Sequence, residues 1–202
     1  MIYIYGDSHA RFIFKNLHID NHNQSQNSIT MFRIGRDNHI INFNKDKYIN
    51  ENDIICLVYG EIDCRCHIQR QINIGRNEDD VIHKLVYKYF LTIHNNIKIY
   101  KKIVVVGIIS PTAQNEYEKI HGPIKHEFPF IGTDEDRVRY TTKMNKLLEE
   151  YCIKNEYIFF NPYHHYTREN GLLKHELSDS TVHLGNNAYF LEKFTALYNT
   201  FL

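Results

Sequence analysis

Three residues near the two ends of the chain have the types that acyl transfer through a serine requires. Ser8 lies in a Gly-Asp-Ser-His turn directly after the apolar run Met-Ile-Tyr-Ile-Tyr, where a buried strand would end. Asp179 and His183 stand four residues apart near the C-terminus, close enough for one loop to carry a base and the acid that orients it. The pattern predicts a nucleophilic Ser8, with His183 as general base and Asp179 as its acid partner.

Ser8 and His183 also have purely structural interpretations. Serine caps helices well at a strand-to-helix turn, so Ser8 could do no more than begin the first helix. His183 is one of 13 histidines and gains weight only from the block of residues around it. The nucleophile interpretation therefore depends on the two blocks meeting in the fold.

The apolar runs of the chain predict a parallel sheet. Five such runs have strand length and alternate with segments of helical periodicity, which is the pattern of a sheet covered on both faces. We expect strands at 2–5, 29–34, 54–59, 103–109 and 157–160, and helices at 79–94, 138–153 and 186–202. The predicted fold class is α/β, with three layers (α/β/α) and a parallel sheet of about five strands.

The candidate catalytic residues fall at the C-terminal ends of expected strands or in the loops after them, where open α/β sheets bind their ligands. The connection over residues 110–136 is long for a compact domain and contains three prolines, so we expect it to form a lid or rim beside the substrate. The helix expected at 186–202 would hold the His183 loop against the sheet.

Length and composition favour a single domain and exclude several classes of partner. The 202 residues, 43% of them apolar, suit one α/β domain spanning 1–202. The 24 basic and 24 acidic residues give a formal net charge of zero, which argues against binding to nucleic acid. No apolar run approaches the roughly 20 residues of a membrane span. Because a cleaved signal peptide would have to contain Ser8, we expect a cytoplasmic protein.

The four cysteines are expected to be reduced thiols. They are too few and too irregularly spaced for a disulfide scaffold, and the gap between the middle two is wrong for a CxxC motif. Ser-His-Asp chemistry needs no metal or organic cofactor, and we expect neither.

Four short blocks together resemble the SGNH, or GDSL-like, hydrolase family over nearly the whole chain. Gly6-Asp7-Ser8-His9 looks like the first block, whose serine is the nucleophile and whose serine amide donates to the oxyanion. Gly35, expected just after the second strand, looks like the glycine of the second block, a further oxyanion donor. Gly60-Glu61-Ile62-Asp63 looks like the third block, and Asp179 with His183 looks like the fifth. The resemblance implies a flavodoxin-like fold of the SGNH type.

The third block departs from the family pattern. It usually supplies an asparagine side chain to the oxyanion hole, whereas this chain has Ile62, which cannot donate a hydrogen bond. Losing one such donor typically slows an enzyme by about 10²- to 10³-fold. Arg65 or Asn38 could replace it, and the Gly-Glu-Ile-Asp sequence resembles a divergent subgroup that carries it in place of the usual block. The candidates for oxyanion or substrate binding are Asp7, Gly35, Asn38, Glu61, Asp63 and Arg65.

The spacing of the acid also departs from the family pattern. Asp179 stands four residues before the histidine instead of three, and Ser180 occupies the usual position. A one-residue insertion in the loop would have to bring Asp179 to the imidazole. Without the acid, a serine-histidine dyad would keep part of the activity, because the acid mainly orients and stabilises the imidazolium.

Glu61 and Asp63 have structural interpretations as well. Asp63 could pin the loop that follows the third strand, and Glu61 could pair with Arg65 or Arg36. Both carboxylates would then act on the loop and not on the substrate.

The resemblance implies an enzyme that cleaves ester bonds or transfers acyl groups. His183 would take the proton of Ser8, Asp179 would hold the imidazole, and the amides of Ser8 and Gly35 would stabilise the oxyanion. The polar residues of 110–136, with Tyr117, favour a small acyl group such as O-acetyl on a carbohydrate. The expected partner is thus a small-molecule or glycan ester, and hydrolysis and acyl transfer both stay open.

Two other classes of function stay open. Gly6-Asp7-x-His9 would also serve as the first metal-binding motif of a metallophosphoesterase, but the later metal-binding segments of that family are absent. Ile62 and the shifted acid would fit a catalytically silent SGNH-like domain that binds a glycan or a partner. Metal content would separate the first class from ester chemistry, whereas Ser8 and His183 argue against the second.

Overall fold

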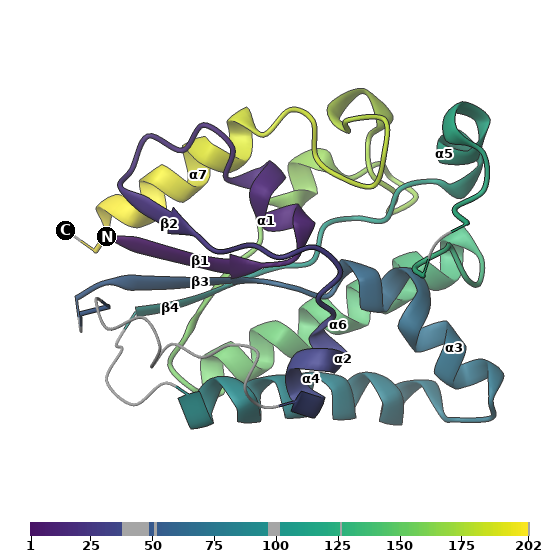
Figure 1. Cartoon of the computed structure of the whole chain (residues 1–202), viewed down its shortest axis with the longest axis horizontal. Coiled ribbons are helices and arrows are strands. Elements are labelled where there is room, and N and C mark those ends of the chain that lie inside the picture. Colours follow the sequence, from purple (N-terminus) through teal and green to yellow (C-terminus); the bar gives the residue numbers. More distant parts are fainter. Residues whose placement is uncertain (38–48, 51, 97–101, 126, 202) are drawn as a thin grey trace.

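The computed structural model describes residues 1–37, 49–50, 52–96, 102–125 and 127–201. Its centre is a parallel sheet of five strands in the order β2-β1-β3-β4-β5 (Figure 1). The strands are β1 Ile2–Gly6, β2 Asn21–Asn23, β3 Ile54–Val58, β4 Lys102–Val106 and β5 Ile158–Phe160. This strand order is the flavodoxin-like one, so the predicted α/β fold class is confirmed.

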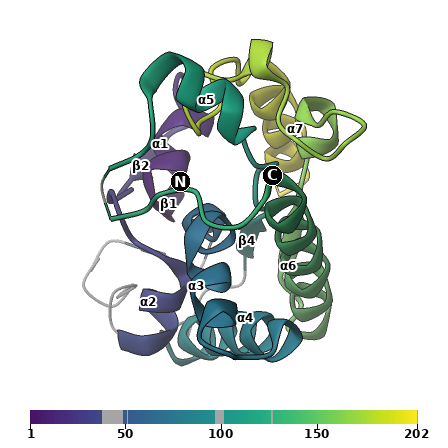
Figure 2. The same ribbon diagram turned by 90° about the vertical axis from the view of Figure 1, so that its right-hand side faces the viewer.

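Helices cover both faces of the sheet and complete the three layers. One face carries α1 (Ser8–Ile13) and α7 (Ala188–Asn199), and the other carries α2 (Met31–Asp37), α4 (Glu78–Asn96) and α6 (Asp134–Lys154) (Figure 1, Figure 2). Beyond the C-terminal ends of the strands lie α5 (Gln114–His121) and α3 (Ile68–Asn73), which follows a π-helical turn at Asp63–His67. None of the described helices is long and apolar enough to cross a membrane.

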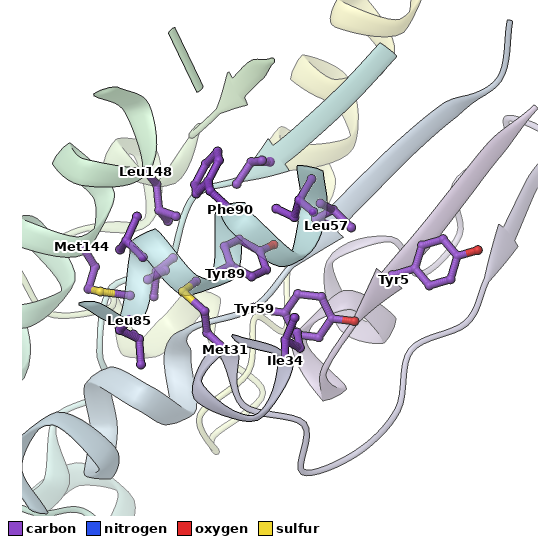
Figure 3. Close-up of a cluster of buried hydrophobic side chains, with 14 of the residues drawn as sticks. Tyr5, Met31, Ile34, Leu57, Tyr59, Leu85, Tyr89, Phe90, Met144 and Leu148 are labelled. Carbon is purple, nitrogen blue, oxygen red and sulfur yellow. The ribbon is translucent and has the colours of Figure 1, made fainter. Parts of the chain in front are cut away.

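Alternate residues of each strand pack on opposite faces, as the period of a strand requires. In β1, Ile2 and Ile4 belong to the cluster beneath α1 and α7, whereas Tyr3 and Tyr5 belong to the cluster formed with α2, α4 and α6. Figure 3 shows the second cluster, with Tyr5, Met31, Ile34, Leu57, Tyr59, Leu85, Tyr89, Phe90, Met144 and Leu148 labelled. The predicted free thiols are confirmed, since the buried and unpaired cysteines are Cys56, Cys64, Cys66 and Cys152.

The strand predicted at 29–34 is wrong, because this segment begins helix α2. The carboxylate of Asp63 accepts hydrogen bonds from the amides of Met31 at 2.6 Å and Phe32 at 3.2 Å. The hydroxyl of Thr30 accepts from the amide of Arg33 at 3.0 Å. The free amides of the helix start are thereby satisfied, which overrides the strand preference of an apolar, β-branched run. The second strand is β2 instead, whose three polar residues are exposed.

Gly35 lies inside α2, where it lets this helix approach α4 closely. A Cβ built on Gly35 would lie 2.8 Å from the Cβ of Lys88 and 3.3 Å from the amide nitrogen of Tyr89. At an interior helix position its own amide belongs to the helix hydrogen bonds. The prediction that Gly35 follows the second strand is therefore wrong, and with it the expected place of its amide beside Ser8.

The other predicted elements lie close to their expected positions. The strands predicted at 54–59 and 103–109 end earlier, at Val58 and Val106. Helices α4, α6 and α7 occupy the segments predicted as helical, although α6 begins at Asp134, before the predicted residue 138. The connection at 110–136 is not a plain loop, because it contains α5 and the start of α6.

Gly35→Ala is expected to destabilise the fold, although alanine favours a helix over glycine by about 1 kcal/mol. The added methyl would push α2 against the backbone of α4, and overpacking of this kind typically costs about 1–3 kcal/mol. We expect a net loss of about 1 kcal/mol in the free energy of unfolding, measured by urea denaturation. Arg33→Ala, at an exposed position of the same helix, should stay within about 0.5 kcal/mol. A gain in stability for Gly35→Ala would rule out the tight contact.

Candidate active site

The turn between β1 and α1 presents Ser8 at the C-terminal end of the sheet. Asp7 is the N-cap of α1 and accepts from the amide of His9 at 2.8 Å, so Ser8 is the first helical residue and its hydroxyl does no capping. A Cβ at Gly6 would lie 2.4 Å from that of Ala10, which explains the glycine in this turn. Burial raises the pKa of Asp7 to about 6, against the lowering effect of His9. The capping interpretation of Ser8 is wrong, because the cap is Asp7.

The hydroxyl of Ser8 meets the imidazole of His183 from the opposite end of the chain. Ser8 Oγ lies 2.9 Å from Nε2 of His183. The histidine belongs to a loop before α7 that is closed by an antiparallel bridge between Ser178 and Leu184. Within this loop the amide of Asp179 donates to the carbonyl of His183 at 3.1 Å. The fold thus brings together the two blocks that the sequence places far apart.

Asp179 reaches the other ring nitrogen of His183 both directly and through Thr181. Its Oδ2 lies 3.4 Å from Nδ1 of His183, and its Oδ1 accepts from the amide of Thr181 at 2.8 Å and from the hydroxyl at 2.5 Å. The same hydroxyl lies 3.0 Å from Nδ1. Burial raises the pKa of Asp179, but its contacts with His183 and Thr181 outweigh burial and lower the pKa to about 2. Asp179 is therefore an anion at neutral pH.

These hydrogen bonds assign the tautomer of His183. The hydroxyl of Thr181 has one proton, which it donates to Asp179, so its oxygen can only accept from Nδ1. Nδ1 therefore carries the proton, and Nε2 offers its lone pair to Ser8. Burial and the neighbouring His9 lower the pKa of His183 below its ordinary value, against the carboxylate of Asp179. A neutral imidazole with a free Nε2 is the state that a general base needs.

The backbone at Ser180 accommodates the one residue by which the spacing of Asp179 and His183 exceeds the family pattern. Ser180 adopts a left-handed conformation, with φ of 67°. Its carbonyl accepts from Nε2 of His121 at 2.9 Å, and the next carbonyl, of Thr181, accepts from the hydroxyl of Thr112 at 3.1 Å. Both donors belong to the rim connection, defined here as residues 107–133 apart from 126. Asp179, and not Ser180, faces the imidazole at the unusual spacing of four.

The ring of His183 packs against two aromatic side chains of α1. Phe12 stacks on it, with ring centroids 4.1 Å apart and planes tilted by only 9°. The ring of His9 lies 4.7 Å from it at an angle of 48°. Because both side chains come from the helix that begins at Ser8, they fix the imidazole relative to the hydroxyl.

Glu61, Asp63 and Arg65 form a buried group behind this pair. Glu61 lies 3.1 Å from Nε2 of His9 and 3.0 Å from Nε of Arg65, so Arg65 is the ion-pair partner that the structure gives it. Burial raises the pKa of Glu61, but these partners outweigh burial and lower the pKa to about 2. Asp63 holds the start of α2, and burial raises its pKa to about 7. Arg65 also donates to the carbonyl of Phe128 at 2.9 Å.

Two further oxyanion candidates are Asn38 and Arg65. Asn38 lies outside the described residues. Ile62 is buried, and the contacts of Arg65 lead to Glu61 and the rim connection. The loop after β2, residues 24–30, is instead joined to the turn of the nucleophile, because the amide of Gln26 donates to the carbonyl of Gly6 at 2.8 Å.

A cavity of about 540 Å³ lies away from the reactive pair, between α2, α3 and α4. Its lining includes Phe32, His67 and Lys84 but neither Ser8 nor His183. The side chain of His183 is 17% exposed at the C-terminal edge of the sheet. Within the part of the chain that the structure describes, no three His, Cys, Asp or Glu side chains gather as a potential metal site.

Comparisons with known proteins were informative only at the level of structure. No family model matches the chain, and no curated protein matches it. Its structure is similar to that of a candidate platelet activating factor from Streptococcus pneumonia, with a TM-score of 0.64 and 15% identity over 100% of this chain and 83% of that one. A GDSL-like lipase from Bacteroides thetaiotaomicron gives a TM-score of 0.59 and 15% identity over 99% and 86%. An acetylxylan esterase from Geobacillus stearothermophilus, solved as a catalytic mutant, gives 0.58 and 11% over 98% and 92%.

These likenesses identify the fold as that of the SGNH, or GDSL-like, hydrolases. They extend over 98% or more of this chain, so the shared fold accounts for nearly all of it. The resemblance inferred from the four sequence blocks is confirmed for the fold. At 11–15% identity the comparisons say nothing about the substrate.

Thr181→Val is expected to disturb the tautomer of His183. Valine has nearly the same shape as threonine but no hydroxyl, so the Nδ1 proton would keep only the 3.4 Å contact with Asp179. Nitrogen-15 NMR of the imidazole at neutral pH should show one dominant tautomer, protonated at Nδ1, in the unmodified protein and a mixture in Thr181→Val. Thr181→Ser keeps the hydroxyl and should keep the single tautomer. An unchanged spectrum in Thr181→Val would show that Asp179 alone orients the ring.

Proposed function

We propose that the chain is a serine hydrolase that acts on ester bonds. The contact of 2.9 Å between Ser8 Oγ and His183 Nε2 carries this proposal, because a hydroxyl becomes a nucleophile where a base can take its proton. The ionised Asp179 on the other side of the imidazole supports it. So does the fold, which is shared with a GDSL-like lipase and an acetylxylan esterase.

In the proposed mechanism His183 moves one proton in each half of the reaction. It takes the proton of Ser8 as the oxygen attacks the acyl carbon, while Asp179 stabilises the imidazolium. The imidazolium then protonates the leaving alcohol, and the acyl group stays on Ser8 as an ester. Water, or the hydroxyl of an acceptor sugar, loses a proton to His183 as it attacks this ester. The bond between the acyl carbon and Ser8 Oγ then breaks, and the imidazolium returns the proton to the serine oxygen.

Backbone amides supply the oxyanion donors in this proposal. The amide of Ser8 lies at the first position of α1, where the helix itself does not use it. The loop after β2 replaces Gly35 as the source of a second amide, since the bond between Gln26 and Gly6 joins this loop to the nucleophile turn. With Ile62 in place of an asparagine, we expect a rate lower by about 10²- to 10³-fold than that of an enzyme with the full set of donors.

We propose a small acyl group on a polar alcohol as the substrate, such as an O-acetyl group on a carbohydrate. Polar side chains border the nucleophile turn, among them Arg11 of α1 and Asn27 of the loop after β2, which bond to each other at 2.6 Å. A few such groups at the edge of a site can orient the hydroxyls of a sugar. The acetylxylan esterase of the same fold offers an example of this substrate class.

A fluorophosphonate probe is expected to add to Ser8 of the unmodified protein. Ser8→Ala removes the attacking oxygen and His183→Ala removes the base, so both variants should lose the adduct in intact-mass analysis. His18→Ala, at an exposed histidine, is the control and should be labelled like the unmodified protein. No adduct under conditions that label a known serine hydrolase would refute the proposal and favour a catalytically silent binding domain.

Asp179→Asn is expected to slow this labelling by about 10²- to 10⁴-fold. The amide of asparagine can donate to Thr181 or the imidazole, which favours the wrong tautomer of His183. Ser180→Ala, at the position where the family pattern has its acid, is the matched control. It should change the rate less than about threefold, because the bonds to Asp179 and His183 come from Thr181, whereas Ser180 bonds through its backbone amide and carbonyl. Equal losses in the two variants would count against Asp179 as the acid.

A further inference from the structure

A line of buried charged side chains runs from the rim connection to His183. Arg65 donates to the carbonyl of Phe128 in the rim at 2.9 Å, and its Nε lies 3.0 Å from Oε1 of Glu61. Oε2 of Glu61 lies 3.1 Å from Nε2 of His9. The ring centroid of His9 lies 4.7 Å from that of His183. The line therefore ends on the imidazole that contacts Ser8.

The three side chains before His183 are almost fully removed from solvent. Their exposed fractions are 6% for Arg65, 7% for Glu61 and 3% for His9. A buried charge is stable only where opposite charges and hydrogen bonds compensate for the lost hydration. Glu61 has such compensation from a cation on each side, and its own charge favours a proton on His9.

Four groups face His9 from the elements packed around it. The carboxylates of Asp7, in the preceding turn, and Glu61, after β3, favour the protonated imidazole. Arg65, in the π-helical turn, and His183, in the loop before α7, disfavour it. Burial lowers the pKa of His9, but the two carboxylates outweigh burial and raise the pKa above its ordinary value. The two carboxylates therefore favour the cationic form of His9, whose ring lies beside the imidazole of His183.

We propose that His9 is a positioning residue for His183: held as a cation by Glu61, it packs against the neighbouring imidazole and disfavours a second positive charge there. His183 then stays neutral, and able to accept a proton, at a lower pH than an isolated histidine would. That His183 takes the proton of Ser8 rests on the proposed function. The contact between the rings of His9 and His183, and the charges around His9, do not depend on it. Asp179 and Glu61 both oppose the effect of His9 and keep the imidazolium accessible during the reaction.

The bonding of His9 argues against a role in packing alone. Its Nδ1 is buried and has no hydrogen-bond partner among the residues that the structure describes. Its polar contact is thus the one with Glu61, and its other side meets His183. An apolar side chain of similar size would fill the same space without the burial of an ion pair, which a packing role does not require.

His9→Gln tests the charge while it keeps the hydrogen bond. The amide nitrogen of glutamine can reach the place of Nε2 and donate to Glu61, but it carries no charge. The rate at which fluorophosphonate labels Ser8 is measured across the pH range in which histidines titrate. In His9→Gln the acidic limb of this profile is expected about one pH unit higher than in the unmodified protein. His18→Gln, the same change at an exposed histidine, should leave the limb in place.

NMR titration of the His183 imidazole measures the effect of His9 on the pKa of His183 directly, without any labelling. A rise of about one unit in the pKa of His183 in His9→Gln supports the proposal even if the probe never labels Ser8, so failure of the proposed function is recognised separately. Slower labelling at every pH, with the limb and the pKa of His183 unchanged, would overturn the proposal and leave His9 a packing residue.

Glu61→Gln provides a second test should His9→Gln fail to fold. Glutamine keeps an oxygen near His9 but removes the charge that favours its proton. The pKa of His9, followed by NMR, should then fall from above to below 6.5, because burial outweighs the influence of Asp7 alone. An unchanged pKa of His9 in this variant would show that Glu61 does not hold it as a cation and would overturn the proposal.

Discussion

The hydrogen bond between Ser8 and His183 joins residues 175 positions apart, and it forms only if α1 and α7 keep a fixed relation. Asn187 provides this relation at the start of α7. Its side-chain amide donates to the carbonyls of Phe12 at 3.2 Å and Lys15 at 2.8 Å, at the end of α1. The carbonyl of Phe12 also accepts from the amide of Lys15 at 3.3 Å, so the bonds of Asn187 add to the hydrogen bonds of this helix end and join the two helices. Ser8 and His183 are thereby carried by one rigid unit on one face of the sheet.

The orientation of the imidazole within this unit comes from several weak constraints. The direct contact of Asp179 with Nδ1, at 3.4 Å, is too long for a strong hydrogen bond, and Thr181 supplies the shorter link. Stacking on Phe12 restricts the tilt of the ring, and His9 restricts it further. The rim connection in turn holds the loop of Asp179, because the side chains of Thr112 and His121 donate to backbone carbonyls of that loop. A loop with one residue more than the family pattern can therefore still present its acid, because side chains outside the loop fix the ring.

The sequence allowed prediction of those parts of the fold and site whose signals are local. Four of the five strands are apolar runs, but β2 is a polar, exposed edge strand that pairs with β1. The helix in place of the strand predicted at 29–34 depends on Asp63, which is distant in sequence. Thr181 stands between the acid and the base and could be read as their link from the sequence. The role of His9 could not, because it depends on Glu61, 52 positions away.

The buried carboxylates give Gly-Glu-Ile-Asp a structural role at the place where the SGNH family pattern has an asparagine donor. Burial raises the pKa of Asp7 to about 6, against the charge of His9, and that of Asp63 to about 7, against the amides of Met31 and Phe32. Glu61 is equally buried but keeps a pKa of about 2, because Arg65 is one helical turn further on and His9 lies opposite. In the proposed mechanism Ile62 therefore offers no hydrogen bond to the oxyanion. The preceding residue, Glu61, instead places a fixed negative charge on the far side of His9 from His183. In that mechanism the buried charges act on the protonation of the His183 imidazole and not on the oxyanion.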